Sequence, residues 1–215
     1  MPELDGPRWG PADKSRPAQL VVLCHGVGAD GHDLIDLAPR WGIALPQAAY
    51  AAPDAPEPCD MGGTGFGRQW FAIGDRRPAI LQAGAAAAAG VLDRFIDAEL
   101  ARLGLPPDAY ALMGFSQGAM VALQCGLRRA VPPRAILAFS GALLQPAGIT
   151  ARPPVLLVHG EIDQVVPVER SRAAEAALQA AGIAVESAYR PALGHGIDEV
   201  GLTAGALFLQ RAFAT

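Results

Sequence analysis

Residues 114–118 read Gly-Phe-Ser-Gln-Gly, so a serine hydroxyl is flanked by glycines two positions away on either side. An apolar run ends at Gly114, and a helical pattern begins directly after Ser116. A strand, a sharp turn and a helix in this order are typical of a nucleophile elbow, in which side chains at the two glycine positions would collide. The pattern predicts Ser116 as a strained nucleophile above the free N–H groups of a helix; an ordinary glycine-rich turn is the alternative.

A serine is a poor nucleophile until a general base accepts its proton, and the base needs a third group to orient it. We look for both groups after the serine, in the order Ser…Asp…His. His195 alone follows both the serine and a later acidic residue at a strand end. We therefore predict His195 as the base, with room to swing provided by the glycines beside it; a surface or helix-capping histidine is the alternative. The other histidines are His25, His32 and His159.

The orienting acid is sought in the segment HGEIDQVVP, which offers Glu161 and Asp163. We favour Asp163 because it lies further from the preceding strand, just before Val165–Pro167, which we expect to re-enter the core. It would accept a hydrogen bond from His195 and stabilise the imidazolium form. Glu161 is the alternative, whereas Asp198 is interpreted as a first-turn carboxylate of the last helix.

A tetrahedral intermediate needs two backbone donors for its oxyanion. One expected donor is the N–H of Gln117, which follows the nucleophile. The other is the N–H of Val27, in the segment HGVGADG that follows an apolar strand. A plain glycine-rich connector is the alternative for this segment. The segment HGVGADG lacks the lysine of a phosphate-binding loop. Gly63–Gly67 is not a dinucleotide fingerprint, because such a fingerprint must follow a strand and this segment does not.

Near-continuous apolar runs alternate with helical patterns along the chain. This arrangement predicts a parallel sheet covered by helices on both faces, with the strand-end loops gathered at one edge. Between two of these elements, Pro53–Gly67 is expected to form a long functional loop. The expected strands are 19–24, 47–52, 109–114, 134–139, 155–159 and 185–190, and the expected helices are 33–41, 77–103, 117–129, 168–181 and 197–213.

The composition fits one globular domain, since 51% of the 215 residues are hydrophobic and 18% are charged. We expect an irregular N-terminal segment over 1–18 and a single domain over 19–215. The formal net charge is −4 without a basic stripe, which argues against a nucleic-acid partner. Three widely spaced cysteines predict buried free thiols rather than a disulfide framework or a zinc site. They are Cys24, Cys59 and Cys125.

The N-terminal residues carry charges and prolines without an apolar core, so they do not read as a secretory signal. We expect no membrane span, because no apolar stretch runs uninterrupted for about 18 residues. The apolar segment Ala83–Val91 is mostly alanine and is interpreted as a close-packed helix. Together with the expected free thiols, these features favour a cytoplasmic location.

Six segments in fixed order carry a family resemblance: LCHGVGADGHDL near residue 23, GRQWF at 67–71, GFSQGAM at 114–120, FSGAL at 139–143, VLLVHGEIDQVVPVERS at 155–171 and LGHGID at 193–198. They resemble the phospholipase/carboxylesterase family of α/β-hydrolases, small serine esterases that include acyl-protein thioesterases. The resemblance implies an α/β-hydrolase fold: an open, mostly parallel twisted sheet with helices on both faces and no separate lid domain. It also implies Ser116, Asp163 and His195 as the catalytic triad, and the Val27 and Gln117 amides as the oxyanion hole.

The resemblance is weakest over residues 53–67, a loop that we expect to line the substrate pocket. The expected pocket residues are Met61, Phe66, Trp70, Phe71 and Leu143, with core packing as the alternative for the two aromatic residues Trp70 and Phe71. The expected activity is hydrolysis of short- to medium-chain acyl esters through an acyl-enzyme, without metal or cofactor. The alternatives are an acyl-protein thioesterase, a lysophospholipase or a non-catalytic binding module. An apolar rim around the site is compatible with a homodimer.

Overall fold

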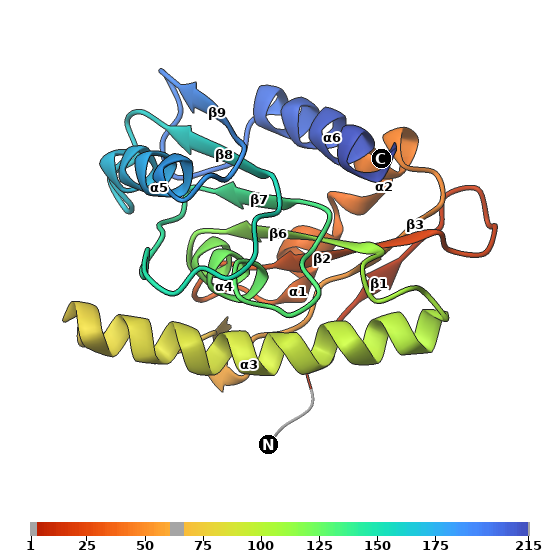
Figure 1. The fold of residues 1–215 in the computed structure, drawn as a ribbon, viewed down its shortest axis with the longest axis horizontal. Helices are drawn as coiled ribbons and strands as arrows, with labels where there is room; N and C mark the ends of the chain where they lie inside the picture. The colour runs from red at the N-terminus through yellow and green to blue at the C-terminus, as the bar shows by residue number, and fades with distance from the viewer. Residues whose placement is uncertain (1–3, 61–66, 215) are drawn as a thin grey trace.

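The fold is that of a computed structural model, in which residues 4–60 and 67–214 are described. Its centre is a seven-stranded sheet in the order β1-β3-β2-β6-β7-β8-β9 (Figure 1). All neighbouring strands of this sheet are parallel except the edge pair β1–β3. The strands are β1 (Arg8–Trp9), β2 (Gln19–Cys24), β3 (Ala48–Ala51), β6 (Tyr110–Phe115), β7 (Ile136–Phe139), β8 (Val155–Gly160) and β9 (Val185–Arg190). A separate antiparallel pair joins β4 (Glu57–Pro58) to β5 (Arg68–Gln69).

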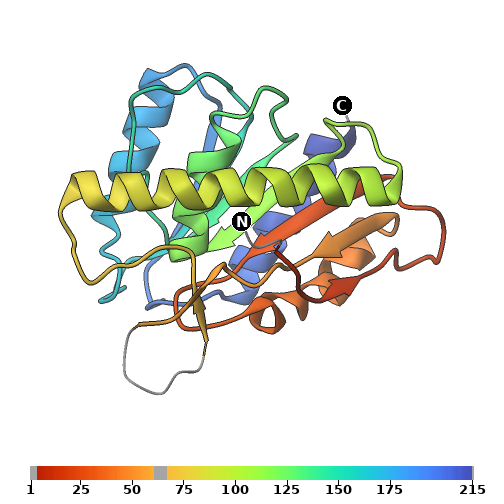
Figure 2. The same cartoon turned by 90° about the horizontal axis from the view of Figure 1, so that it is seen from below.

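Helices cover both faces of the sheet (Figures 1 and 2). They are α1 (Gly31–Ile35), α2 (Ala38–Ala44), α3 (Pro78–Leu103), α4 (Gln117–Gly126), α5 (Glu169–Ala180) and α6 (Glu199–Ala214). Buried residues of α3, α4 and α5 form one hydrophobic cluster with the sheet, and those of α1, α2 and α6 form a second. Within residues 4–60 and 67–214, no separate lid domain covers this architecture.

Strand β2 illustrates why the sequence reads as an unbroken apolar run. Leu20 and Val22 belong to the cluster under α3 and α4, whereas Val21 and Leu23 belong to the cluster on the opposite face. Successive side chains of a strand point to opposite faces, so a sheet buried on both sides needs apolar residues at every position. The predicted α/β architecture is therefore confirmed.

Three segments differ from the sequence prediction. The expected loop over 53–67 contains a short strand, β4, which pairs with β5. The single helix expected over 33–41 is two short helices, α1 and α2, and Pro39 lies in the first turn of α2. Proline favours a helix start because it has no N–H to donate to the preceding turn. The N-terminal segment over 1–18 was expected to be irregular, yet Arg8–Trp9 forms β1 and pairs with β3.

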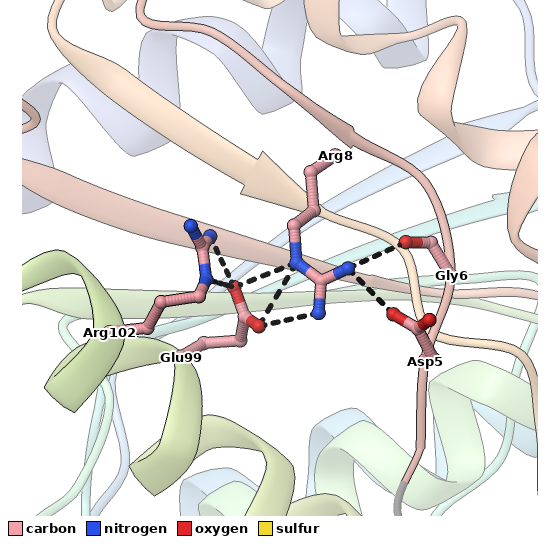
Figure 3. Close-up of polar contacts among 5 residues, drawn as sticks. All are labelled: Asp5, Gly6, Arg8, Glu99 and Arg102. Atoms are coloured by element: carbon pink, nitrogen blue, oxygen red, sulfur yellow. Dashed lines mark hydrogen bonds and ion pairs between the residues drawn. The ribbon is translucent and has the colours of Figure 1, made fainter.

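An ion-pair network attaches this N-terminal strand to α3 (Figure 3). The guanidinium of Arg8 donates to both carboxylate oxygens of Glu99, at 2.6 to 3.1 Å. Arg102 donates to the same carboxylate, and Arg8 also donates to Asp5 and to the carbonyl oxygen of Gly6. Burial raises the pKa of Glu99, but these hydrogen bonds outweigh burial and hold it below its ordinary value.

The long helix α3 runs from Pro78 to Leu103 and is capped by Gly104, whose left-handed φ of 64° suits glycine. It is also the one helix in the described part of the chain that is long and apolar enough, by length and composition, to cross a membrane. Its buried residues, including Ala85, Leu92 and Ile96, pack into the cluster beneath the sheet. In this fold α3 therefore serves as a covering layer of the sheet (Figure 2).

Candidate active site

Ser116 lies at the turn between β6 and α4, with φ 54° and ψ −117°. A positive φ is unfavourable for a residue other than glycine, so the turn holds Ser116 under strain. A Cβ atom at Gly114 would lie 2.3 Å from the carbonyl oxygen of Gly118, and one at Gly118 would lie 2.0 Å from that of Cys24. Because both distances are far below van der Waals contact, the predicted need for glycine at these two positions is confirmed.

The two residues expected to provide oxyanion donors line the same cavity as Ser116. Gln117 is the first residue of α4, where backbone N–H groups have no partner within the helix, and Val27 follows the end of β2. Both residues line the cavity together with Ser116. Among the described residues, neither N–H has a hydrogen-bond acceptor. These two donors are therefore available to a bound oxyanion.

The side chain of Gln117 fastens a cavity wall to the elbow. Its amide oxygen accepts a hydrogen bond from the N–H of Trp70 at 2.8 Å, and its amide nitrogen donates to the carbonyl oxygen of Phe71 at 2.7 Å. Gln117 is only 2% exposed, so both bonds are shielded from water. Sequence reasoning assigned only a backbone role to this residue.

His25 is a buried structural histidine at the end of β2. Its Nε2 accepts from the N–H of Ala55 at 2.9 Å, so Nδ1 carries the hydrogen and donates to the carbonyl oxygen of Gly26 at 2.7 Å. Burial lowers the pKa of His25 below its ordinary value. The neutral ring thereby connects Ala55 to the Gly26 carbonyl, which belongs to the same peptide group as the Val27 amide, and Trp70 adds a hydrogen bond from its indole N–H to the His25 carbonyl oxygen.

The structure brings Asp163 and His195 together, although they follow different strands. Oδ2 of Asp163 lies 2.7 Å from Nδ1 of His195, so Nδ1–H donates and Nε2 is left as the acceptor. Oδ1 accepts from the N–H groups of Val165 and Val166 at 2.8 and 2.9 Å. Burial raises the pKa of Asp163, but its hydrogen bonds with His195 and these amides lower it overall. Asp163 is therefore ionised and firmly oriented.

A second histidine, His159, also contacts the Asp163 carboxylate, and the sequence analysis did not anticipate this contact. The fully buried Nε2 of His159 lies 3.2 Å from Oδ2 of Asp163 and 2.8 Å from the carbonyl oxygen of Val166. Nε2 faces two acceptors and so carries the hydrogen, while Nδ1 lies 2.6 Å from the hydroxyl of Ser171. The available signal was the position of His159 four residues before Asp163, at the end of β8.

Ser116 and His195 are not hydrogen-bonded to each other among the described residues; the elbow contacts the histidine through Phe115 instead. The Phe115 and His195 rings lie 4.9 Å apart between centroids, with an angle of 43° between their planes. Catalytic hydrogen bonds are often long in a ligand-free site and shorten in the complex with substrate. The imidazole is 19% exposed, which leaves its outer edge accessible to a ligand.

The alternative acids lie elsewhere. Glu161 pairs with Arg172 at 2.7 Å on the surface. Asp198 pairs with Arg190 at 2.9 Å and accepts from the N–H of Gly201, immediately before α6 begins. Both carboxylates are therefore occupied by other partners, whereas Asp163 is the acid that contacts His195.

The glycines beside His195 are not required by steric contact or by backbone conformation. A Cβ atom at Gly194 would have no neighbour within 4 Å, and neither Gly194 nor Gly196 has a positive φ. The glycine that does matter is Gly160, where a Cβ would lie 2.1 Å from the carbonyl oxygen of Leu193. The histidine loop is therefore placed by its close approach to the end of β8.

A cavity of about 350 Å³ extends from Ser116. Of the expected pocket residues, Phe71 and Leu143 line it. Trp70 does not: it is 1% exposed and packs in the core, where its indole N–H is held by His25, which corrects the pocket assignment. Met61 and Phe66 lie outside the described residues.

Several residues that line the cavity were not anticipated from the sequence. Val165 and Val166 were expected to re-enter the core, but both line the cavity and Val165 is 66% exposed. The N–H groups of both valines donate to Oδ1 of Asp163, and these hydrogen bonds direct the chain along the cavity rather than into the core. Other unanticipated lining residues are Ile73, Arg76, Leu81, Met120, Leu144 and Arg170.

The three cysteines form no disulfide, and Cys24 and Cys125 are buried as expected, although Cys59 is only half-buried. Burial raises the pKa of the Cys125 thiol to about 12, which keeps it protonated.

Within residues 4–60 and 67–214, no group of three histidine, cysteine or acidic side chains is arranged to hold a metal ion.

A strained serine between a central parallel strand and a helix, together with a later Asp–His pair at the same sheet edge, defines the class of α/β-hydrolases. A profile of the phospholipase/carboxylesterase family matches residues 11–212, and the chain belongs to this family. It is accordingly a serine hydrolase with esterase activity.

Individual relatives agree with this membership. The esterase YpfH of Escherichia coli is 30% identical over 85% of this chain and 78% of its own. The acyl-protein thioesterase 1 of Gibberella zeae is 28% identical over 86% of this chain and 89% of its own. Among solved structures, that of esterase PE8 is similar with a TM-score of 0.91 and 42% identity, covering 98% of this chain and 99% of the other.

Proposed function

We propose that the protein hydrolyses carboxylic esters with short- to medium-length acyl chains, with Ser116 as nucleophile, His195 as general base and Asp163 as its orienting acid. The observation that carries the proposal is the Asp163–His195 hydrogen bond of 2.7 Å at the sheet edge where the strained Ser116 meets a cavity. With Nδ1–H engaged by the carboxylate, Nε2 of His195 is the atom left to accept a proton.

In the proposed reaction, Nε2 of His195 takes the proton of the Ser116 hydroxyl as its oxygen attacks the ester carbonyl. The imidazolium then gives this proton to the leaving alcohol, which departs as the acyl-enzyme forms. A water molecule next loses a proton to His195 and attacks the acyl carbonyl, and the proton returns to Ser116 as the carboxylic acid leaves. Asp163 stays ionised throughout and stabilises the imidazolium.

In both tetrahedral intermediates, the backbone N–H groups of Val27 and Gln117 would bind the oxyanion. Their freedom from other acceptors in the described structure supports this assignment. The position of Gln117 at the start of α4 adds the favourable end of the helix dipole.

The cavity supports the choice of acyl group. Its lining is mainly apolar, with Phe71, Leu81, Met120 and Leu143 among the contributing residues, and such a surface suits a hydrocarbon chain. A volume of about 350 Å³ is small for a ligand site, which favours short to medium chains. The proposed reaction uses no metal or cofactor, and we propose a cytoplasmic location for it.

The direct test is Ser116→Ala, assayed with p-nitrophenyl butyrate. We expect turnover to fall to the background rate, because the hydroxyl that forms the acyl-enzyme is missing. Ser140→Ala is the matched control: Ser140 also has a positive φ but is fully buried outside the cavity lining, and its loss should leave turnover intact. Full activity of folded Ser116→Ala protein would refute the proposal.

Acyl thioesters are the second candidate substrates, since the acyl-protein thioesterase relatives bear that activity in their names. A chain-length series of p-nitrophenyl esters and matched thioesters, compared by kcat/KM, separates the two classes. A fluorophosphonate probe addresses the non-catalytic alternative, because a binding module would fold normally and remain unlabelled at Ser116.

A further inference from the structure

Two charged residues line the otherwise mostly apolar cavity, and both are arginines. Arg76 lies two residues before α3, and Arg170 lies in the first turn of α5. A cation near a helix N-terminus is opposed by the helix dipole, which favours negative charge there. Neither position is thus explained by the stability of its helix.

The arginines beside these two are neutralised, whereas Arg76 and Arg170 are not. Arg77 pairs with Asp75 at 2.5 Å, and Arg172 pairs with Glu161 at 2.7 Å. In the described structure, the guanidinium groups of Arg76 and Arg170 donate to no other residue. Many other arginine side chains donate to a carboxylate or a backbone carbonyl oxygen, namely those of Arg8, Arg40, Arg68, Arg102, Arg128, Arg129, Arg134, Arg152, Arg190 and Arg211.

No carboxylate is among the described residues that line the cavity, so the two arginines give the cavity a net positive charge. The whole chain, by contrast, has a formal net charge of −4. A planar guanidinium with free donors matches the oxygens of a carboxylate or phosphate group. Because both side chains are exposed, such a group can reach them from solvent without burying an unpaired charge.

We propose that the preferred ester substrates carry an oxyanion group, a carboxylate or phosphate, which Arg76 and Arg170 bind while the scissile carbonyl lies at Ser116. The apolar lining between these points holds the connecting hydrocarbon. This inference rests on the proposed esterase function and narrows its substrate class.

The test compares two p-nitrophenyl esters of equal shape. One is the half-ester of adipic acid, which ends in a carboxylate, and the other carries an isopropyl group in place of that carboxylate. We expect wild-type protein to favour the anionic ester at least tenfold in kcat/KM, roughly the strength of a charge-assisted hydrogen bond, mainly through a lower KM. The preference should shrink as salt is added, because both guanidinium groups are exposed.

Four variants identify the residues responsible. Arg76→Gln and Arg170→Gln are each expected to bring the ratio of the two kcat/KM values towards one. Arg77→Gln and Arg172→Gln, which remove the neighbouring paired arginines, should keep the wild-type ratio. Since all four side chains lie at the surface, the substitutions leave the core intact, and thermal unfolding checks this.

A third ester, with a terminal phosphonate, separates the two oxyanions, and a preference for either over the neutral ester supports the inference. If wild-type protein hydrolyses all three esters equally, or if the two control variants lose the preference as fully as Arg76→Gln and Arg170→Gln do, the inference is overturned while the esterase proposal stands. If it hydrolyses none of them, the esterase proposal itself fails, and this inference falls with it.

Discussion

At the scale of single residues, the site is organised around the carboxylate of Asp163. Its two oxygens contact His195, His159 and the amides of Val165 and Val166. A carboxylate held by so many donors has little freedom to rotate, so it presents one oxygen to His195 in a constant direction. The buried His159 therefore helps to fix the orientation of the Asp163 carboxylate, a role that the sequence motif around Asp163 does not reveal.

The first prediction concerns this carboxylate. Asp163→Asn keeps the shape of the side chain but removes the charge that stabilises an imidazolium and selects the His195 tautomer. We expect kcat for p-nitrophenyl butyrate to fall by about 10³- to 10⁴-fold. Glu161→Gln is the control, and because Glu161 pairs with Arg172 it should retain nearly full kcat. A comparable loss in both variants would contradict the assignment of Asp163.

A second residue-scale prediction follows from His25, whose pKa burial lowers below 6.5. Below that pH the unfolded chain binds a proton that the folded chain does not, so the free energy of unfolding falls as pH falls. We expect His25 to contribute a loss in the free energy of unfolding as the pH falls from about 7.5 to 5.5, through its ordinary pKa. Urea unfolding at both pH values should show a smaller loss in His25→Gln, and an unchanged pH dependence would disprove the prediction.

At the scale of secondary-structure elements, the elbow depends on how closely α4 approaches β2. Gly118 is the contact point, because a Cβ there would lie 2.0 Å from the backbone carbonyl oxygen of Cys24. Backbone atoms cannot move aside as the end of a flexible side chain can. The first turn of α4 therefore sets the position of Ser116, and the N–H of Gln117 goes with it.

The prediction at this scale compares two glycines. Gly118→Ala must shift α4 away from β2, and we expect a loss of about 2–3 kcal/mol in the free energy of unfolding and a much lower kcat. Gly194→Ala is the control: it lies next to His195, but its Cβ would meet no atom within 4 Å, so stability should change little. Chemical denaturation and ester hydrolysis measure both effects. Equal stability of the two variants would argue against the close contact.

At the scale of the whole molecule, the Arg8–Glu99 ion pair joins parts of the chain that are 91 residues apart. It attaches the edge strand β1 to the long helix α3, as Figure 3 shows. The side chain of Glu99 is 4% exposed, so its charge depends on Arg8 and Arg102 for compensation. Because the pKa of Glu99 is held below its ordinary 4.5, this stabilisation is present above about pH 4.5 and is lost on acidification.

Arg8→Met tests this connection. It leaves a buried carboxylate with one cation instead of two, and we expect the free energy of unfolding to fall by about 2 kcal/mol, less than for a fully buried pair because Arg102 remains. The double variant Arg8→Met/Glu99→Leu should recover part of the loss, since no buried charge is then left uncompensated. Arg40→Met, which removes an exposed pair with Glu199, should have little effect. A failure of Glu99→Leu to rescue the variant would contradict this account.

The sequence by itself determined the order of strands and helices and the glycines of the elbow, because these depend on local patterns that are written in neighbouring residues. It also narrowed the acid to Glu161 and Asp163, and its motifs indicated the family. Only the tertiary structure decided that Asp163 contacts His195, that Trp70 lies in the core and that Val165 lines the cavity. It also decided that Arg76 and Arg170 both line this cavity without a partner among the described residues. These outcomes depend on the direction of loops from separate strands, and packing between distant segments sets that direction without any periodic signal along the chain.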